Sequence, residues 1–281
     1  MKTHHRVIFG DSRHMDTIRD GSVHLVVTSP PYWHLKDYGE DVEIGQGSTT
    51  FEEYMSSLCA VFEECVRKLA PDGKLIINVM PMLLPGDTST FNRRVTKTVL
   101  TELEGYMDSL GNMYLMSLHI WDKRKAVRFS SWGSYPYPPN MLSSYPYEWI
   151  IVFSKSGRRD PVDPSLKEAS RITHREFTDW VQNSIWDFQP ASASREGHPA
   201  PFPEELPKRC IKLYSFVGDT VLDPFAGTGT TLSAARRLGR SSIGYEVNAD
   251  YEDLIRTKLG VNEDWGDQAT FEFIREAARS K

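Results

Sequence analysis

Short apolar runs alternate with helical patterns along most of this 281-residue chain. Such alternation is typical of an α/β fold, in which a mostly parallel sheet carries helices on both faces. Hydrophobic residues make up 40% of the chain, which is enough for a sizeable buried core. We therefore predict a single α/β domain over residues 1–281. Its strands are expected near residues 7–9, 23–28, 74–79, 114–121, 148–153, 220–222 and 241–246.

The predicted helices fall between these strands. From residue 51 to 69, apolar side chains recur at helical spacing, before Pro71-Asp72-Gly73 is expected to turn the chain into the next strand. Further helices are expected from about Pro203 to Tyr214, from Gly229 to Leu238, and after Asn248 as N-cap.

Three segments depart from the alternation. Residues 81–112 and 154–201 do not fit it, and we interpret them as insertions. The segment Trp132–Asn140 holds three prolines, which lack the backbone donor that a helix or inner strand needs. We expect an aromatic-rich loop there, without regular structure.

Charge is unevenly distributed along the chain. The formal net charge is -5, which argues weakly against a nucleic-acid partner, because phosphate binding depends on positive charge. Residues 119–176, however, hold ten basic and six acidic residues, with aromatics interleaved. This mixture favours a nucleic-acid groove. Its candidate bases are Lys123, Arg124, Lys125, Arg128, Lys155, Arg158, Arg159, Arg171 and Arg175.

Membrane, disulfide and metal signals are missing from the sequence. No apolar stretch approaches the roughly 20 residues that span a bilayer, and no signal-peptide core follows Met1, so a cytoplasmic protein is expected. Cys59, Cys65 and Cys210 form no CxxC pair and are expected as reduced thiols. The eight histidines form no ligand cluster, so no metal site is predicted.

Two strings at the ends of apolar runs carry the functional signal. Thr28-Ser29-Pro30-Pro31-Tyr32-Trp33 follows one run, and Asp223-Pro224-Phe225-Ala226-Gly227-Thr228-Gly229-Thr230-Thr231 follows another. The second reads as strand, glycine turn and helix, a turn that lets a ligand approach the backbone. It lacks the third glycine of the dinucleotide fingerprint and the lysine of a P-loop. Glu246, nineteen residues after Gly227, suits two ribose hydroxyls and so favours a nucleoside ligand.

Together the strings resemble those of the β class of DNA amino-methyltransferases. In that class the catalytic motif precedes the cofactor motif, which is a circular permutation of the Rossmann-like S-adenosylmethionine-dependent methyltransferase fold. The resemblance covers most of the chain. It includes Gly10-Asp11-Ser12, similar to the turn that contacts the cofactor's adenine, and His198–Pro203, similar to the loop over its methionine end. It implies S-adenosyl-L-methionine as cofactor, bound by Asp11, Phe202, Asp223, Phe225, Gly227, Gly229 and Glu246.

The resemblance assigns catalysis to Ser29, Pro30, Pro31 and Tyr32. An exocyclic amine is a poor nucleophile because its lone pair is delocalised into the ring, so acceptors must engage its hydrogens. Ser29 offers a hydroxyl and Pro30 a carbonyl. Tyr32 and Trp33 are expected to offer a ring on which a base flipped out of the duplex can stack.

The first residue of the catalytic string bears on the target base. Thr-Ser-Pro-Pro-Tyr-Trp resembles the N4-cytosine enzymes, whereas Asp-Pro-Pro-Tyr accompanies N6-adenine methylation. Ser29 therefore predicts N4-methylcytosine, with N6-methyladenine as the alternative and an RNA methyltransferase as a less favoured one. A C5-cytosine enzyme is disfavoured because no Pro-Cys supplies the thiolate nucleophile. A dehydrogenase is the alternative that would bind NAD in preference to S-adenosylmethionine. A non-enzymatic DNA-binding module would show damage to the catalytic or the cofactor string, and neither string is damaged.

Double-stranded DNA is the partner that this resemblance implies, together with a companion restriction endonuclease and a homodimer. The insertions at 81–112 and 154–201 are the candidate target-recognition regions, through Arg93, Arg94 and Lys97 or through residues 155–186. Tyr135 and Tyr137 are further candidates for contact with the flipped base.

Overall fold

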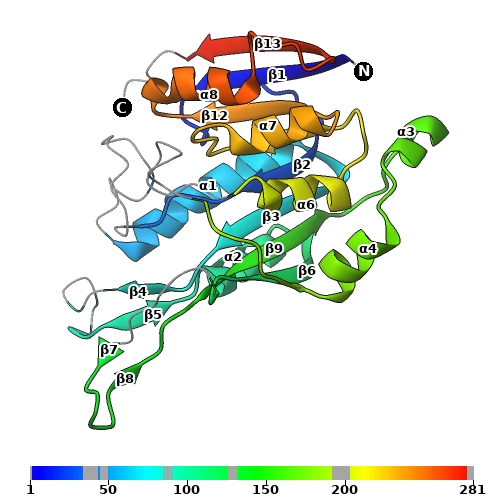
Figure 1. The fold of residues 1–281 in the computed structure, drawn as a ribbon. Helices are drawn as coiled ribbons and strands as arrows, with labels where there is room; N and C mark the ends of the chain where they lie inside the picture. Colours follow the sequence, from blue (N-terminus) through cyan, green and yellow to red (C-terminus); the bar gives the residue numbers. More distant parts are fainter. Residues whose placement is uncertain are drawn as a thin grey trace.

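The computed structural model describes residues 2–33, 44, 50–84, 86, 89, 91–125, 132–191 and 203–276. At its centre lies a nine-stranded sheet of order β10-β6-β9-β3-β2-β11-β12-β1-β13 (Figure 1). All neighbours are parallel except at β9, which runs antiparallel to β3 and β6. Every predicted strand is present, so the mostly parallel α/β fold is confirmed. The strands are β1 Lys2–Phe9, β2 Val23–Thr28, β3 Leu69–Val79, β6 Met113–Asp122, β9 Tyr147–Lys155, β10 Ile185–Trp186, β11 Thr220–Asp223, β12 Ser241–Glu246 and β13 Gln268–Arg275.

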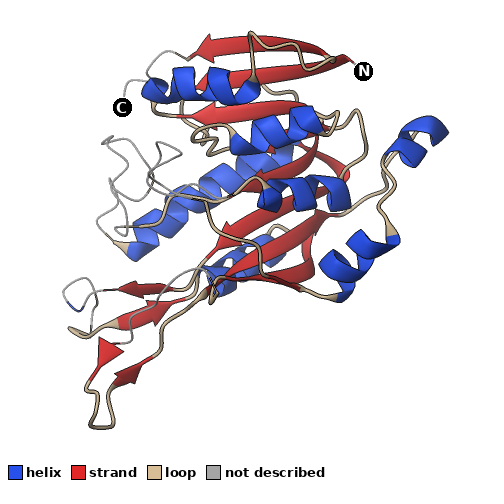
Figure 2. Ribbon diagram, viewed as in Figure 1, coloured by secondary structure: helices blue, strands red, loops and turns tan. Residues whose placement is uncertain are grey.

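Helices cover both faces of the sheet (Figure 2). Val26 of β2 packs in the core beneath one set of helices, while its neighbours Leu25 and Val27 point to the opposite core, as strand geometry requires. The first set is α1 Phe51–Lys68 and α2 Val99–Ser109; the second is α6 Glu205–Tyr214, α7 Thr230–Arg237 and α8 Glu252–Leu259.

The helix boundaries follow local capping chemistry. Thr50 caps α1 through a capping box with Glu53: its hydroxyl accepts from the Glu53 amide at 3.1 Å, and the Glu53 carboxylate accepts from the Thr50 amide at 3.3 Å. Asn248 caps the short 3-10 turn η3 Ala249–Tyr251, which continues into α8. The predicted helices near residues 51–69, 203–214 and 229–238 and after Asn248 are thus confirmed.

One expected turn and one expected loop are corrected. Pro71-Asp72-Gly73 lies inside β3, because Leu69 already pairs with Val23; a register shift and the positive φ of Asp72 (61°) absorb the irregularity. The segment Trp132–Asn140 is irregular only from residue 134. Its first two residues form β7 Trp132–Gly133, which pairs with β8 Met141–Leu142.

The two segments interpreted as insertions contain several elements. Residues 81–112 hold β4 Met82–Leu84 and β5 Val95–Lys97, which form a hairpin, and α2, which covers the sheet. Residues 154–201 include α3 Pro164–Ala169, α4 His174–Phe177, η2 Thr178–Gln182 and the edge strand β10. Within the described residues, no helix combines the length and hydropathy needed to cross a membrane.

The topology places the two functional strings side by side. Strands β2 and β11 are far apart in the sequence but pair directly, with Leu25 opposite Val221 and Val26 opposite Leu222. Because the strands are parallel, the loops that follow β2 and β11 leave the sheet at the same edge. In open α/β sheets, ligands bind outside this carboxyl edge.

Candidate functional site at the carboxyl edge of the sheet

Asp223 joins the catalytic and cofactor strings. Its side chain is buried, and its Oδ1 accepts from the Thr28 hydroxyl at 2.7 Å and from the Phe225 amide at 3.1 Å. Its Oδ2 accepts from the Thr231 hydroxyl at 2.6 Å. Burial raises the pKa of this carboxyl to about 6. Asp223 therefore fixes the end of β2, the glycine turn and the first turn of α7 relative to one another.

Close packing shapes the glycine turn between β11 and α7. Gly227 and Gly229 have positive φ angles of 51° and 81°, a conformation that favours glycine. Gly244 on the neighbouring strand β12 is a further requirement that the sequence reasoning missed. A Cβ there would lie 2.7 Å from Leu232 Cδ1 and 3.0 Å from Ala226 Cβ. Its hydrogen side chain lets α7 and the turn approach the sheet.

Glu246 lies at the end of β12 and faces this turn. Its Oε2 accepts from the Gly227 amide at 2.7 Å, and its Oε1 accepts from the Asn248 amide at 2.9 Å. These two contacts orient the carboxylate, and a carboxylate oxygen can accept more than one hydrogen bond.

The other predicted cofactor residues are Asp11, Phe225 and Phe202, of which the structure describes the first two. Asp11 follows β1, and its carboxylate binds Arg13 through both oxygens, at 2.6 to 3.0 Å. Burial opposes ionisation of Asp11, but the hydrogen bonds and charge of Arg13 prevail and lower its pKa. Phe225 is half-buried against the core. Phe202 and His198 lie outside the described residues.

The catalytic string begins where β2 ends. The Ser29 hydroxyl donates to the backbone oxygen of Asn78 at 3.2 Å, and the Tyr54 hydroxyl donates to the Pro31 oxygen at 3.1 Å. Tyr32 is 7% exposed. Trp33 was expected as a stacking ring, but it is 2% exposed and packs edge-on against Phe51, with ring centroids 5.8 Å apart. Its ring belongs to the core and is closed to a base in this structure.

The sequence reasoning missed an ion pair between buried Glu148 and partly buried Lys123, which contacts residues beside this string. Glu148 at the start of β9 contacts Lys123, which follows β6; their side chains are 8% and 14% exposed. Asn78 Nδ2 donates to Glu148 Oε2 at 2.5 Å and lies 3.5 Å from the Ser29 hydroxyl oxygen. The Tyr32 hydroxyl lies 3.5 Å from the same carboxylate oxygen. Glu148 thus contacts Asn78 and Tyr32, two neighbours of Ser29.

The basic segment predicted to form a nucleic-acid groove is largely neutralised. Six of its nine candidate bases form ion pairs, namely Lys123, Arg124, Lys125, Arg159, Arg171 and Arg175. Lys155 donates to the backbone oxygens of Val66 and Leu69, both at 2.7 Å, and Arg128 lies outside the described residues. The prediction counted charges along the chain, whereas most of these charges are compensated in the fold.

The cysteines are free thiols, and burial raises their pKa, to about 11 for Cys59. Among the described residues, no group of three or more histidine, cysteine, aspartate or glutamate side chains is placed to hold a metal ion.

Comparison with known proteins now decides the family. A family model described as DNA methylase matches residues 23–257, which include both strings. The chain belongs to this DNA methylase family. The type II methyltransferase M.MjaI of Methanocaldococcus jannaschii is 34% identical to it over 93% of either chain. M.MthZI of Methanothermobacter thermautotrophicus is 32% identical, covering 92% of this chain and 77% of the relative.

Solved structures agree with the fold. A protein of Thermus thermophilus, provisionally described as a DNA modification methylase and solved with S-adenosyl-L-methionine, is 32% identical. It superposes with a TM-score of 0.76, covering 98% of this DNA methylase chain and all of the other. The cytosine-N4-specific PvuII DNA methyltransferase covers 92% and 87% of the two chains, with a TM-score of 0.59 and 18% identity. That likeness shows a shared fold alone.

The residues present fit the cofactor bound by the Thermus protein. S-adenosyl-L-methionine needs acceptors for its ribose hydroxyls and a backbone that its charged methionine end can approach. Glu246 is a carboxylate acceptor beside the turn, and Gly227 and Gly229 carry no side chain there, just before α7 begins.

Proposed function

We propose that this protein is a site-specific DNA methyltransferase that transfers a methyl group from S-adenosyl-L-methionine to the exocyclic N4 amine of a flipped-out cytosine. The observation that carries the choice of base is Ser29, a neutral hydroxyl at the position where N6-adenine enzymes of the resembling class have aspartate. N6-adenine methylation by the same site is the second candidate.

The geometry around Ser29 supports its role as an acceptor. Its hydroxyl hydrogen points to the Asn78 carbonyl, so a lone pair of the oxygen can receive a hydrogen of the target amine. The Pro30 carbonyl receives the other amine hydrogen. With both hydrogens held, the nitrogen leaves conjugation with the ring, and its lone pair points at the donor. When bound, the cofactor supplies an electrophilic methyl group.

Positioning accounts for the remaining chemistry. The hydrogen bond between Thr28 and Asp223 connects the strand that carries Ser29 to the cofactor turn, so base and methyl group approach one another on a fixed frame. Holding two reactants in line in this way supplies a large part of the rate of a displacement reaction. We assign cofactor contacts to Asp11, Phe202, Asp223, Phe225, Gly227, Gly229 and Glu246.

The biological setting is proposed by analogy with the named type II relatives. Double-stranded DNA is the substrate, and a cognate restriction endonuclease is the expected partner in a restriction-modification system. Residues 81–112 and 154–201 are the candidate regions for target recognition. A cytoplasmic location and a homodimer stay predictions.

The decisive experiment identifies the modified nucleoside. The protein is incubated with unmethylated genomic DNA and labelled S-adenosyl-L-methionine, and the digested nucleosides are identified by mass. N4-methylcytosine supports the proposal, whereas N6-methyladenine would assign the same mechanism to the other base.

A serine variant tests the assigned acceptor. Ser29→Ala should abolish methyl transfer while cofactor affinity stays at the wild-type value. The control is Ser109→Ala, since Ser109 is exposed at the end of α2 and its hydroxyl donates to the Tyr106 carbonyl of the same helix. Full activity of Ser29→Ala would remove the serine from the mechanism.

A further inference from the structure

Two hairpins form a single projection from the carboxyl edge of the sheet. We call it the hairpin arm: the described residues of 82–97 and residues 132–142. Its first hairpin begins three residues after β3 ends, and its second ends five residues before β9 begins (Figure 1). Thr96 and Tyr145 hydroxyls lie 2.9 Å apart and tie the first hairpin to the segment that enters β9. The arm is therefore anchored at the edge where Ser29 lies.

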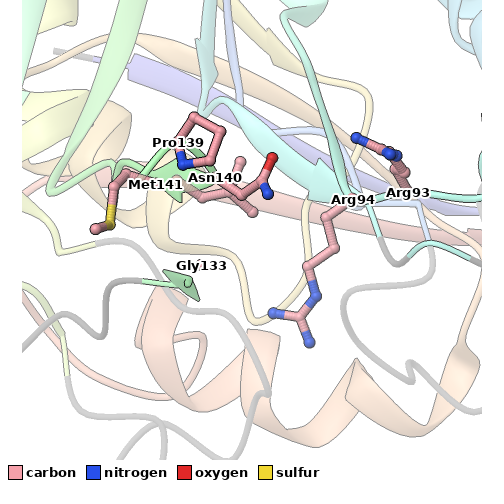
Figure 3. A pocket seen from close by; sticks show the side chains of 7 residues that line it. Arg93, Arg94, Gly133, Pro139, Asn140 and Met141 are labelled. Carbon is pink, nitrogen blue, oxygen red and sulfur yellow. The ribbon is translucent and has the colours of Figure 1, made fainter. Parts of the chain in front are cut away.

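The two hairpins line a shared, open hollow. It measures about 690 Å³ and is lined by Arg93, Arg94, Gly133, Pro139, Asn140, Met141 and Leu142. Figure 3 shows the Arg94 side chain extending from one hairpin and Met141 and Asn140 lying on the other. The hollow is thus formed by both hairpins and is separate from the glycine turn.

The second hairpin holds aromatic side chains out of the core. Gly133 is required there, because its φ is 131° and a Cβ would lie 2.1 Å from the Asn140 oxygen. Ser134 organises the loop: its amide donates to the Asn140 oxygen and its carbonyl accepts from the Tyr137 amide, both at 2.8 Å. Tyr135 and Tyr137 nevertheless remain 86% and 75% exposed.

This exposure is not explained by folding. Phe91 on the first hairpin is 76% exposed, and Met141 on the second is 48% exposed, so four large apolar side chains are exposed on one arm. Monomeric proteins seldom expose such groups together unless they bind a partner.

The charge of the arm indicates which partner. Arg93 and Arg94 are both exposed, and no acidic residue stands among the described residues of the arm. The arm is thus basic on a chain whose net charge is -5. A cationic and aromatic surface suits a nucleic acid, whose phosphates attract arginine and whose bases stack on aromatic rings.

We infer that the hairpin arm binds duplex DNA beside the flipped base. Arg93 and Arg94 contact phosphates, and Tyr135 and Tyr137 stack on the bases that lose a stacking neighbour when the target base flips out. This inference rests on the proposed function only in that DNA is the substrate. It names the part of the 81–112 region that touches DNA and adds the loop at 134–140, which lies outside both proposed recognition regions.

The test measures DNA affinity against salt. Labelled, sheared unmethylated genomic DNA is titrated with wild type, Arg93→Ala/Arg94→Ala and Tyr135→Ala/Tyr137→Ala from 50 to 200 mM salt. Two lost phosphate contacts should lower the slope of log K against log salt by about 1.8, so that wild type loses about 12-fold more affinity over this range than the arginine variant. The tyrosine variant should bind about tenfold more weakly with an unchanged slope.

Matched variants test whether removing any exposed arginine or tyrosine would have the same effect on DNA binding. Arg19→Ala and Tyr114→Ala change exposed residues away from the arm and should behave as wild type. Arg93→Lys/Arg94→Lys keeps both charges and should keep the slope. All variants should bind S-adenosyl-L-methionine normally and reach the wild-type kcat at saturating DNA, with the arm variants raised only in KM.

The outcomes separate the two proposals. If wild type methylates DNA but both arm variants keep the wild-type KM and salt slope, the arm inference is wrong and the proposed function stands. Preferential binding of the arm to duplex RNA would also overturn the inference. If wild type methylates no DNA base, the proposed function itself fails.

Discussion

The buried pair of Lys123 and Glu148 gives the sharpest stability prediction. Glu148 is buried and Lys123 is partly buried, and Glu148 also accepts from Asn78, which contacts Ser29. Lys123→Met removes the cation and leaves an uncompensated carboxylate. Breaking a buried pair in this way costs about 3–5 kcal/mol in the free energy of unfolding. For a chain of this size, that corresponds to a drop in Tm on the order of 10 °C.

A double-mutant cycle distinguishes the charge from the packing. Glu148→Gln keeps an oxygen that accepts from Asn78, so Lys123→Met/Glu148→Gln should recover most of the stability lost in Lys123→Met. Denaturant unfolding measures all four proteins, and methyl transfer reports whether the serine keeps its position. Arg171→Met is the control, because Arg171 and Glu168 are 76% and 73% exposed and such pairs contribute less than about 1 kcal/mol. A loss below about 1 kcal/mol in Lys123→Met, or no recovery in the double variant, would refute the reasoning.

Two further predictions concern the cofactor turn. Gly244→Ala should lower the free energy of unfolding by about 1–3 kcal/mol, because the added Cβ would meet Leu232 at 2.7 Å. The control, Gly105→Ala on helix α2, adds a Cβ into open space and should raise it by about 0.4–1 kcal/mol. Chemical unfolding measures both variants, and equal effects would contradict the packing argument. Since burial raises the pKa of Asp223 from 3.8 to about 6, the folded state binds a proton there that the unfolded chain has released. Its contribution to stability should therefore fall as pH rises from about 4 to about 6, by up to roughly 3 kcal/mol. Asp223→Asn should lack this part of the pH dependence in thermal unfolding, and an identical pH profile for variant and wild type would count against it.

Helix α2 shows where sequence reasoning fell short although a signal was present. Val99, Leu103 and Met107 are buried and recur four residues apart, which is a helical period. We placed them in an insertion because residues 81–112 as a whole do not fit the alternation of strands and helices. The helix can be recognised from the sequence only when the spacing of its apolar residues is considered apart from the hairpin that precedes it.

The sequence by itself determined seven of the nine strands of the central sheet, helices α1, α6, α7 and α8, and the two functional strings. These depend on local spacing, on glycine and proline geometry and on residue identity at the ends of apolar runs. It did not predict the edge strands β10 and β13. The tertiary structure decided which distant groups meet. Strand pairing brought Thr28 to Asp223, and the antiparallel strand β9 brought Glu148 to Lys123 and Asn78. It also paired most of the bases in residues 119–176. Net charge along a chain cannot predict this, because the compensation of a charge depends on neighbours that only long-range folding supplies.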